Sequence, residues 1–248
     1  MATAVAAAPT PSPSPAPPAD ACAVNGHTDL LATINRPTIG FSACAVKPHE
    51  FLGEIGYSNQ SGQAGVVQYP QGFLRYGLEQ GLEVDIIGPA YEIQRPGAAG
   101  FLDPGVGAKW EFAQGRGGTA AIDFLYTAPL GAAAFTTGTP TQTLNIDYST
   151  SLSSRFGVGT TLGVEHTQGF TTLLPSMVLT DQYNSRTQLY GEAYAQTKTG
   201  PDGGSLFGLD GGVQYLLTPQ LEIDVEAGRT VTDLSRNHYY GFGFGVRL

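Results

Sequence analysis

The sequence predicts an all-β chain that closes into an antiparallel up-and-down transmembrane β-barrel of about 12 strands. Three observations support this fold class. From Glu50 onward, apolar and polar residues alternate with a period of two in segment after segment. Long and short connections alternate between these segments, and the chain finishes on an alternating strand. A tilted strand needs about ten residues to cross a bilayer, and bacterial barrels have an even number of strands.

The first six segments each place apolar side chains on one face and charged or small side chains on the other. In the third segment, Leu82, Val84 and Ile86 oppose Glu83 and Asp85. Successive side chains of a strand point to opposite faces, so this alternation predicts strands. The six segments cover residues 51–57, 74–79, 82–86, 106–112, 120–127 and 144–148.

The second half of the chain repeats the scheme. Pro175 lies inside the eighth segment and cannot donate a hydrogen bond to a ladder, so a bulge there or a ten-strand barrel stays open. The last segment alternates large apolar side chains with three glycines and Arg247. The six segments cover residues 155–165, 173–179, 188–195, 207–217, 221–227 and 240–248.

The connections support the same fold. Long stretches rich in Gly, Pro and Ser follow the first, third, fifth and ninth segments, as in residues 88–104 and 128–141. Most of the others are short, such as residues 79–81 and 218–220. Outer-membrane barrels pair long extracellular loops with short periplasmic turns, so both termini are expected in the periplasm.

A soluble β-sandwich would also alternate with a period of two, but three features favour the membrane barrel. The polar face carries many charges, aromatic residues such as Tyr57 and Tyr126 lie near strand ends, and the final strand suits barrel closure. Charged residues make up 13% of the chain, below the usual quarter of a soluble domain. No run of 18 apolar residues predicts a membrane helix.

In a barrel of this kind the charged face lines the lumen. One interpretation is an acidic channel lining that favours cations or polar solutes. The other is a charge-paired core that blocks the lumen. The predicted lining residues are Glu54, Arg75, Glu83, Asp85, Lys109, Glu111, Asp123, Asp147, Arg155, Glu165, Glu192, Asp210, Glu222, Asp224, Glu226 and Arg247.

Three regions are expected along the chain: a disordered Ala/Pro-rich linker over residues 1–21, an N-terminal segment over residues 22–49, and the barrel over residues 50–248. The segment 22–49 is expected as a periplasmic or lumenal plug in which Arg36 pairs with inward carboxylates. Cys22 and Cys44 suit a disulfide in an oxidising periplasm, with two free thiols as the alternative. The first residues lack a basic region and a long apolar core, so no intact signal peptide is recognised.

Several other functions find no support in the sequence. The net charge is -9 and Lys and Arg do not cluster, which argues against binding nucleic acid. None of the four histidines, which are His27, His49, His166 and His238, has a metal-ligand spacing. There is no G-x-S-x-G motif, and Gly241, Gly243 and Gly245 lack the spacing of a dinucleotide-binding loop. We therefore expect no catalytic site, metal or cofactor.

The C-terminal residues Tyr240, Phe242, Phe244, Val246 and Leu248 resemble the signal that hands outer-membrane proteins to the barrel assembly machinery. Over residues 35–248 the chain resembles the family described as "Putative MetA-pathway of phenol degradation". It departs from that family at Ile39-Gly40-Phe41 and at His49. The matching pieces are Asn35-Arg36-Pro37-Thr38 with Ser42, Val46-Lys47-Pro48 with Phe51 and Glu54-Ile55-Gly56-Tyr57, Asp103-Pro104-Gly105-Val106-Gly107-Ala108-Lys109, and Leu221-Glu222-Ile223-Asp224-Val225.

This resemblance implies a bacterial outer-membrane channel or transporter for passive uptake of small hydrophobic or aromatic compounds. The implied partners are outer-membrane lipid and lipopolysaccharide, the barrel assembly machinery and a small-molecule solute. Two alternatives stay open: a structural or adhesive barrel without transport, and a barrel enzyme that modifies lipid.

Overall fold

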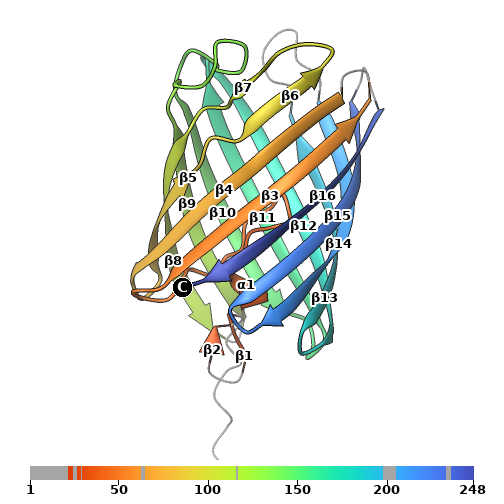
Figure 1. Ribbon diagram of the computed structural model, residues 1–248. Coiled ribbons are helices and arrows are strands. Elements are labelled where there is room, and N and C mark those ends of the chain that lie inside the picture. Colours follow the sequence, from red (N-terminus) through yellow and green to blue (C-terminus); the bar gives the residue numbers. More distant parts are fainter. Residues whose placement is uncertain are drawn as a thin grey trace, which may run out of the picture.

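The computed structural model describes residues 22–24, 27–28, 30–62, 65–115, 117–197, 205–232 and 236–248. The predicted linker at residues 1–21 lies outside this part of the chain. One sheet of 14 strands dominates the fold, and all but β6 and β7 form a closed ring (Figure 1). The twelve strands of the ring are β3 Phe51–Ser61, β4 Gly65–Glu79, β5 Leu82–Ile87, β8 Gly105–Gly115, β9 Gly118–Thr127, β10 Thr141–Ser151, β11 Phe156–Thr167, β12 Phe170–Asn184, β13 Thr187–Gln196, β14 Leu206–Thr218, β15 Leu221–Thr232 and β16 Arg236–Arg247.

Pairing between the last strand and the first closes the barrel. β16 runs antiparallel to β3 from His238 opposite Ser61 to Arg247 opposite Leu52. All other neighbours in the ring are also antiparallel. Closure gives each strand of the ring two partners, which matters in hydrocarbon because no water is present there to satisfy an open edge. The predicted barrel of about 12 strands is confirmed.

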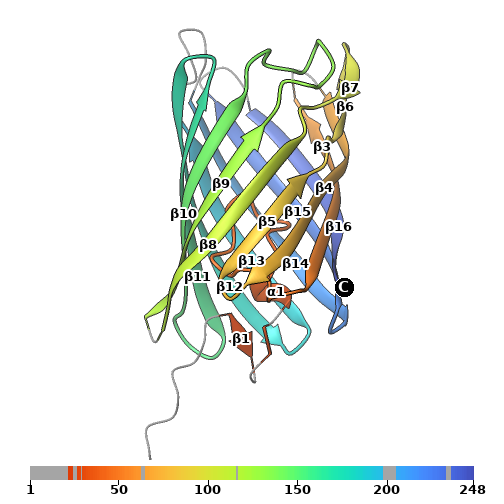
Figure 2. The same ribbon diagram turned by 90° about the vertical axis from the view of Figure 1, so that its left-hand side faces the viewer.

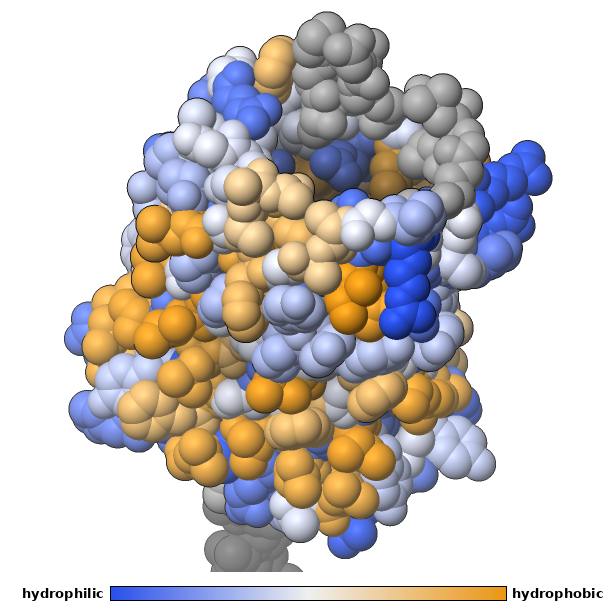
Figure 3. All heavy atoms as spheres, turned by 45° about the horizontal axis from the view of Figure 1, so that its top comes forward, coloured by the Kyte–Doolittle hydropathy of each residue, from blue (hydrophilic) through white to orange (hydrophobic). Residues whose placement is uncertain are grey.

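The alternation in the sequence puts apolar side chains outside and charged ones inside. Val106, Trp110 and Phe242 point outward with exposed fractions of 55%, 57% and 54%, whereas Arg75 and Lys109 are fully buried. Figure 3 shows apolar residues over much of the outer wall and a hollow at the end opposite the C-terminus. A soluble protein of this size would bury its apolar side chains; an apolar exterior around a polar interior is the arrangement of a transmembrane barrel.

The eighth predicted segment is a full strand in spite of its proline. β12 passes through Pro175, which lies opposite Leu162 of β11. The ladder between β12 and β13 begins one residue later, at Ser176 opposite Tyr194. The proline therefore lies at the end of that ladder, where its missing N–H is tolerated, and the ten-strand alternative is wrong.

The connections after the first and third segments differ from the long loops expected there. β3 and β4 extend to Ser61 and Gly65, so their connection is short. Within residues 88–104 the chain forms a hairpin of β6 Tyr91–Arg95 and β7 Ala99–Phe101, and β6 pairs with the first five residues of β4. The β-forming residues of Val66-Val67 and Tyr91-Glu92-Ile93 outweigh the nearby Gly and Pro residues.

The N-terminal segment enters the barrel from the end that carries the C-terminus. It contains the two-residue strands β1 Ala23–Val24 and β2 His27–Thr28 and the short helix α1 Leu30–Thr33. Both ribbon views place α1 inside the wall at that end (Figures 1 and 2). Leu30, Leu31 and Val46 pack there with Leu52 and Leu216 of the wall. In the described residues no helix has the length and hydropathy to cross a membrane.

Candidate functional site

Residues 30–49, which we call the plug, occupy the lumen, and their main chain binds side chains of the wall. The N–H groups of Ile39 and Gly40 donate to the Glu192 carboxylate at 2.8 Å each. The Phe41 N–H donates to the Thr161 hydroxyl at 2.9 Å. On the other side of the lumen, Glu111 and Glu83 accept from the N–H groups of Ala45 and Val46. Inward carboxylates thus satisfy main-chain donors that the plug would otherwise leave unpaired.

Arg36 has the largest set of bonds in the plug. Its guanidinium lies 3.2 Å from Asp224 and donates to Gln71 at 3.2 Å. Its N–H donates to Glu54 at 2.8 Å, and its carbonyl accepts from Gln214 at 2.8 Å. The structure therefore shows the pairing of Arg36 with an inward carboxylate that the sequence analysis proposed.

Lumen-facing glycines make room for the plug. A Cβ on Gly56 of β3 or Gly243 of β16 would overlap the Arg36 guanidinium, and a Cβ on Gly245 would overlap Ile34. A Cβ on Gly77 would meet the carbonyl groups of Val46 and Lys47. These glycines of β3, β4 and β16 thus form a surface without side chains, the glycine surface, on which the plug packs.

A buried ionic network joins the plug to strands β3, β4, β5, β8 and β9. Arg75 lies 2.8 Å from Glu83 and 3.3 Å from Glu54, and it donates to the carbonyl groups of Thr33 and Cys44. Lys109 lies 3.6 Å from Glu83, 3.7 Å from Asp123 and 2.9 Å from the Ser42 carbonyl oxygen. Pairing of this kind is what allows charges to be buried inside a protein.

The predicted lining residues face the lumen with one exception. Arg155 lies in the turn before β11, half-exposed, and binds Asp181 on the outer side of β12. The hydrogen bond and the charge of Asp181 raise the pKa of Arg155. The strand begins only at Phe156, so the two-residue alternation does not extend to Arg155. Its assignment to the lumen is corrected.

The structure also joins Cys22 to Cys44 in a disulfide. It thereby ties the plug to the segment that precedes it.

The predicted list of lining residues left out the neutral polar residues of the site. Gln71, Thr161 and Gln214 bind the plug, yet only charged residues were assigned to the lumen. Each lies on the same face of its strand as a predicted charge, for example Thr161 beside Glu165. The period-two pattern contained this signal.

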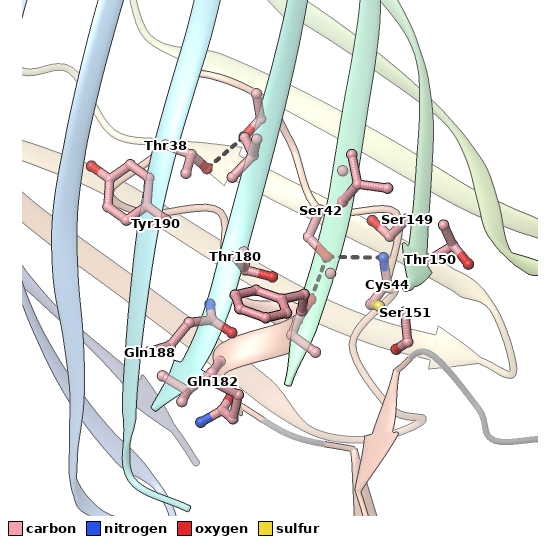
Figure 4. Close-up of a pocket in the computed structure, with 18 of the residues that line it drawn as sticks. Thr38, Ser42, Cys44, Ser149, Thr150, Ser151, Thr180, Gln182, Gln188 and Tyr190 are labelled. Carbon is pink, nitrogen blue, oxygen red and sulfur yellow. Dashed lines mark hydrogen bonds between the residues drawn. The ribbon is translucent and has the colours of Figure 1, made fainter. Parts of the chain in front are cut away.

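Two cavities lie on either side of the plug. The upper cavity, of about 770 Å³, opens toward the end opposite the C-terminus, and the lower cavity, of about 220 Å³, lies on the side of the C-terminus (Figure 4). The two share six lining residues: Arg36, Thr38, Gly40, Phe41, Thr161 and Ser176. The plug therefore separates two cavities that share lining residues along one side of it.

The described residues contain no group of three or more His, Cys, Asp or Glu side chains placed to hold a metal ion. Two inward carboxylates of the upper cavity, Glu165 and Glu226, have no hydrogen bond or ion pair with any other described residue. The upper cavity is therefore lined by two carboxylates without a hydrogen-bond or ion-pair partner among the described residues, while Arg75 and Lys109 are both paired.

Comparison with solved structures gives the same architecture at low sequence identity. The COG4313 outer membrane channel from Pseudomonas putida F1 superposes with a TM-score of 0.64 at 10% identity, over 86% of this chain and 100% of that chain. The NanC porin gives 0.58 at 12% identity, over 79% and 100%. The translocator domain of the autotransporter NalP from Neisseria meningitidis gives 0.53 at 10%, over 80% and 88%. At these identities the likeness concerns the fold alone.

No curated protein matches the chain. A family model does: the one described as "Putative MetA-pathway of phenol degradation" matches residues 36–248, so the chain belongs to that family.

Proposed function

We propose that this protein is a bacterial outer-membrane channel through which small compounds diffuse passively. The observation that carries the proposal is the pair of cavities that share lining residues beside the plug. On that side, three hydrogen bonds to Glu192 and Thr161 hold the plug, and each contributes only about 0.5–3 kcal/mol net. The fold is shared with a protein named as a channel and with a porin.

The solutes we propose are small hydrophobic or aromatic compounds. The description of the family refers to phenol degradation. Aromatic rings are also available in the upper cavity, where Phe41, Phe73, Tyr194 and Tyr239 contribute to the lining. Rings of this kind favour other aromatic rings by edge and stacking contacts.

We place the barrel in the outer membrane with both termini on the periplasmic side. The apolar outer wall suits lipid and lipopolysaccharide, and the N-terminal segment and the C-terminus share one end of the barrel (Figure 1). Tyr240, Phe242 and Phe244 point outward on β16 and Leu248, directly after it, is exposed, where the assembly machinery would bind them. This strand is also the one that closes the ring.

The test is single-channel conductance of the refolded protein in a planar bilayer, compared with a variant that lacks residues 22–49. We expect small conductance steps for the full chain and clearly larger steps for the deletion. Heat-modifiable mobility on a gel checks that both have folded. Folded protein that stays silent in both forms would contradict the channel, and equal conductance would contradict the role of the plug.

A structural barrel without transport is the second candidate. The fully buried network of Arg75 and Lys109 favours it, because this network fills one side of the lumen. A full-length protein that never conducts, together with a deletion variant that does, would favour this candidate.

A further inference from the structure

The two halves of the lumen differ in chemistry at the level of the plug. On β15, β3, β4, β5, β8 and β9 the wall carries charged side chains, and the plug packs closely against them. On β10 to β14, between Asp147 and Glu192 and the end of the barrel that carries the C-terminus, the wall instead carries small or neutral polar residues. Among them are Ser149, Thr180, Gln188 and Gln214. The lower cavity lies on this neutral side only.

The lining of the lower cavity is unusual for so acidic a barrel. Aspartate and glutamate are absent among the described residues that line it. Arg36 pairs with Asp224 inside the lumen, and Arg155, at the edge of the cavity, pairs with Asp181 on the outer side. Hydroxyl and amide groups remain, and these donate and accept hydrogen bonds without charge (Figure 4).

The buried amides are held in fixed positions. Gln214 is 3% exposed; it donates to the Arg36 carbonyl at 2.8 Å and accepts from Gln188 at 2.7 Å. Ile34 and Phe41 of the plug and Val178 of β12 add apolar surface. A few placed polar groups among apolar ones are typical of small-molecule sites. The volume of about 220 Å³ lies below that of most drug-sized sites, so it suits a small solute.

Residues 39–41 of the plug separate this cavity from the upper one, and the two cavities share lining residues there. Gly40 lies directly on the wall, and a Cβ there would overlap the Ser176 hydroxyl and come within 3.2 Å of the Thr161 hydroxyl. Three hydrogen bonds, from the N–H groups of residues 39–41 to Glu192 and Thr161, hold this part of the plug. A shift of these residues alone would join the cavities and leave the ionic network on the other side intact.

We propose that the lower cavity is a binding site for an uncharged, hydroxyl-bearing small molecule, and that this solute passes between the plug and strands β10 to β13. The inference rests on the proposed channel function. It names the path and narrows the proposed solutes to uncharged compounds that carry hydroxyl groups, for which arabinose is the water-soluble probe. The upper cavity with its free carboxylates is the entrance, and the neutral cavity is the last site before the periplasm.

The experiment measures entry of arabinose into liposomes that contain the full-length protein, by osmotic swelling. Thr180→Trp would fill the lower cavity from β12, and Leu179→Trp, at the next residue but facing lipid, is the matched control. We expect the rate of arabinose entry to fall at least fivefold for Thr180→Trp and to change less than twofold for Leu179→Trp. An unchanged rate for a folded Thr180→Trp protein would overturn the path.

A second variant tests recognition without filling the cavity. Thr180→Val keeps the shape of the side chain and removes its hydroxyl. Loss of one hydrogen bond is expected to lower arabinose entry about 2- to 10-fold while single-channel ion conductance stays the same. Unchanged arabinose entry would overturn recognition through hydroxyl groups.

Ion conductance distinguishes a failure of the proposed binding site from a failure of the channel. If the wild-type protein conducts ions but admits no arabinose, this inference alone is contradicted. The same holds if the protein conducts ions and Thr180→Trp admits arabinose as fast as the wild type. A folded protein that passes neither ions nor arabinose contradicts the channel itself, and this inference with it.

Discussion

At the residue scale, the plug is held by a few side chains whose partners are buried. Arg36 is the clearest case, because its guanidinium compensates Asp224, whose side chain is fully buried. Removing one member of a buried pair leaves an uncompensated charge and costs about 3–5 kcal/mol. The pair therefore stabilises the docked plug chiefly through the cost of breaking it.

Replacing Arg36 with alanine should release this part of the plug. We expect Arg36→Ala to raise the single-channel conductance, or the frequency of large openings, because Asp224 would attract water and ions into the lumen. Arg229→Ala is the control, since Arg229 is exposed on the outer face of β15. Equal conductance of Arg36→Ala and wild type would contradict this role of Arg36.

The glycine surface beside Arg36 allows a steric test of plug docking. The side chain introduced by Gly56→Val would occupy the space of the guanidinium, whose atoms are the three nearest to a Cβ at this position, so we expect the plug to shift and the conductance to rise. Gly53→Val is a matched control on β3, because a Cβ at Gly53 meets only Val246 Cγ1 at an ordinary 3.6 Å. Planar-bilayer recordings of both variants check the result. Equal conductance of the two variants would contradict a role of the glycine surface in holding the plug.

Side-chain direction was predictable from the sequence because a strand alternates strictly. That rule placed Glu54, Glu192 and Asp224 inside, where the structure has them. It failed at Arg155, which precedes its strand. The partners of these residues were not predictable, because the path of the plug through the lumen depends on contacts between segments far apart in the chain, such as Ile39 with Glu192.

At the element scale, the strands were predictable and the hairpin of β6 and β7 was not. Strands of the ring alternate over ten residues or so, whereas β6 and β7 are five and three residues long and lie among Gly and Pro. They form because β4 extends beyond its neighbour β5 and offers β6 a free edge. An edge of this kind exists only in the folded barrel.

The plug is an element that a disulfide constrains. The Cys22–Cys44 bond closes a loop with a sequence separation of 22, for which loop-closure entropy predicts about 3 kcal/mol of stabilisation. We expect the double variant Cys22→Ser, Cys44→Ser to dock its plug less stably and to show more frequent large openings. Adding reductant to the wild-type channel should have the same effect, and adding it to the double variant should have none. A wild-type channel insensitive to reductant would contradict a stabilising role.

At the scale of the whole molecule, charge is distributed unevenly through the barrel. The net charge of -9 combines with a lumen in which the three main cations, Arg36, Arg75 and Lys109, are all paired with carboxylates. Two of the carboxylates that pair with no described cation, Glu165 and Glu226, line the upper cavity. The two interpretations left open by the sequence each describe a different part of one lumen: a paired core beside the plug and an acidic entrance above it.

This arrangement predicts a cation-selective entrance. A unit charge about 10 Å away in water contributes about 0.4 kcal/mol, roughly a factor of two in ion permeability. Each carboxylate would favour K⁺ about twofold and disfavour Cl⁻ about twofold. We therefore expect the double variant Glu165→Gln, Glu226→Gln to lower the permeability ratio of K⁺ to Cl⁻ roughly 16-fold, measured as a reversal potential across a KCl gradient. Asp181→Asn, which removes a carboxylate on the outer side, should leave the ratio unchanged. The selectivity should also weaken at 1 M salt, where the Debye length falls to about 3 Å, below the width of the cavity. A ratio that is equal in wild type and in the double variant at low salt would show that ions do not pass these carboxylates, and the entrance would then have to lie elsewhere in the wall.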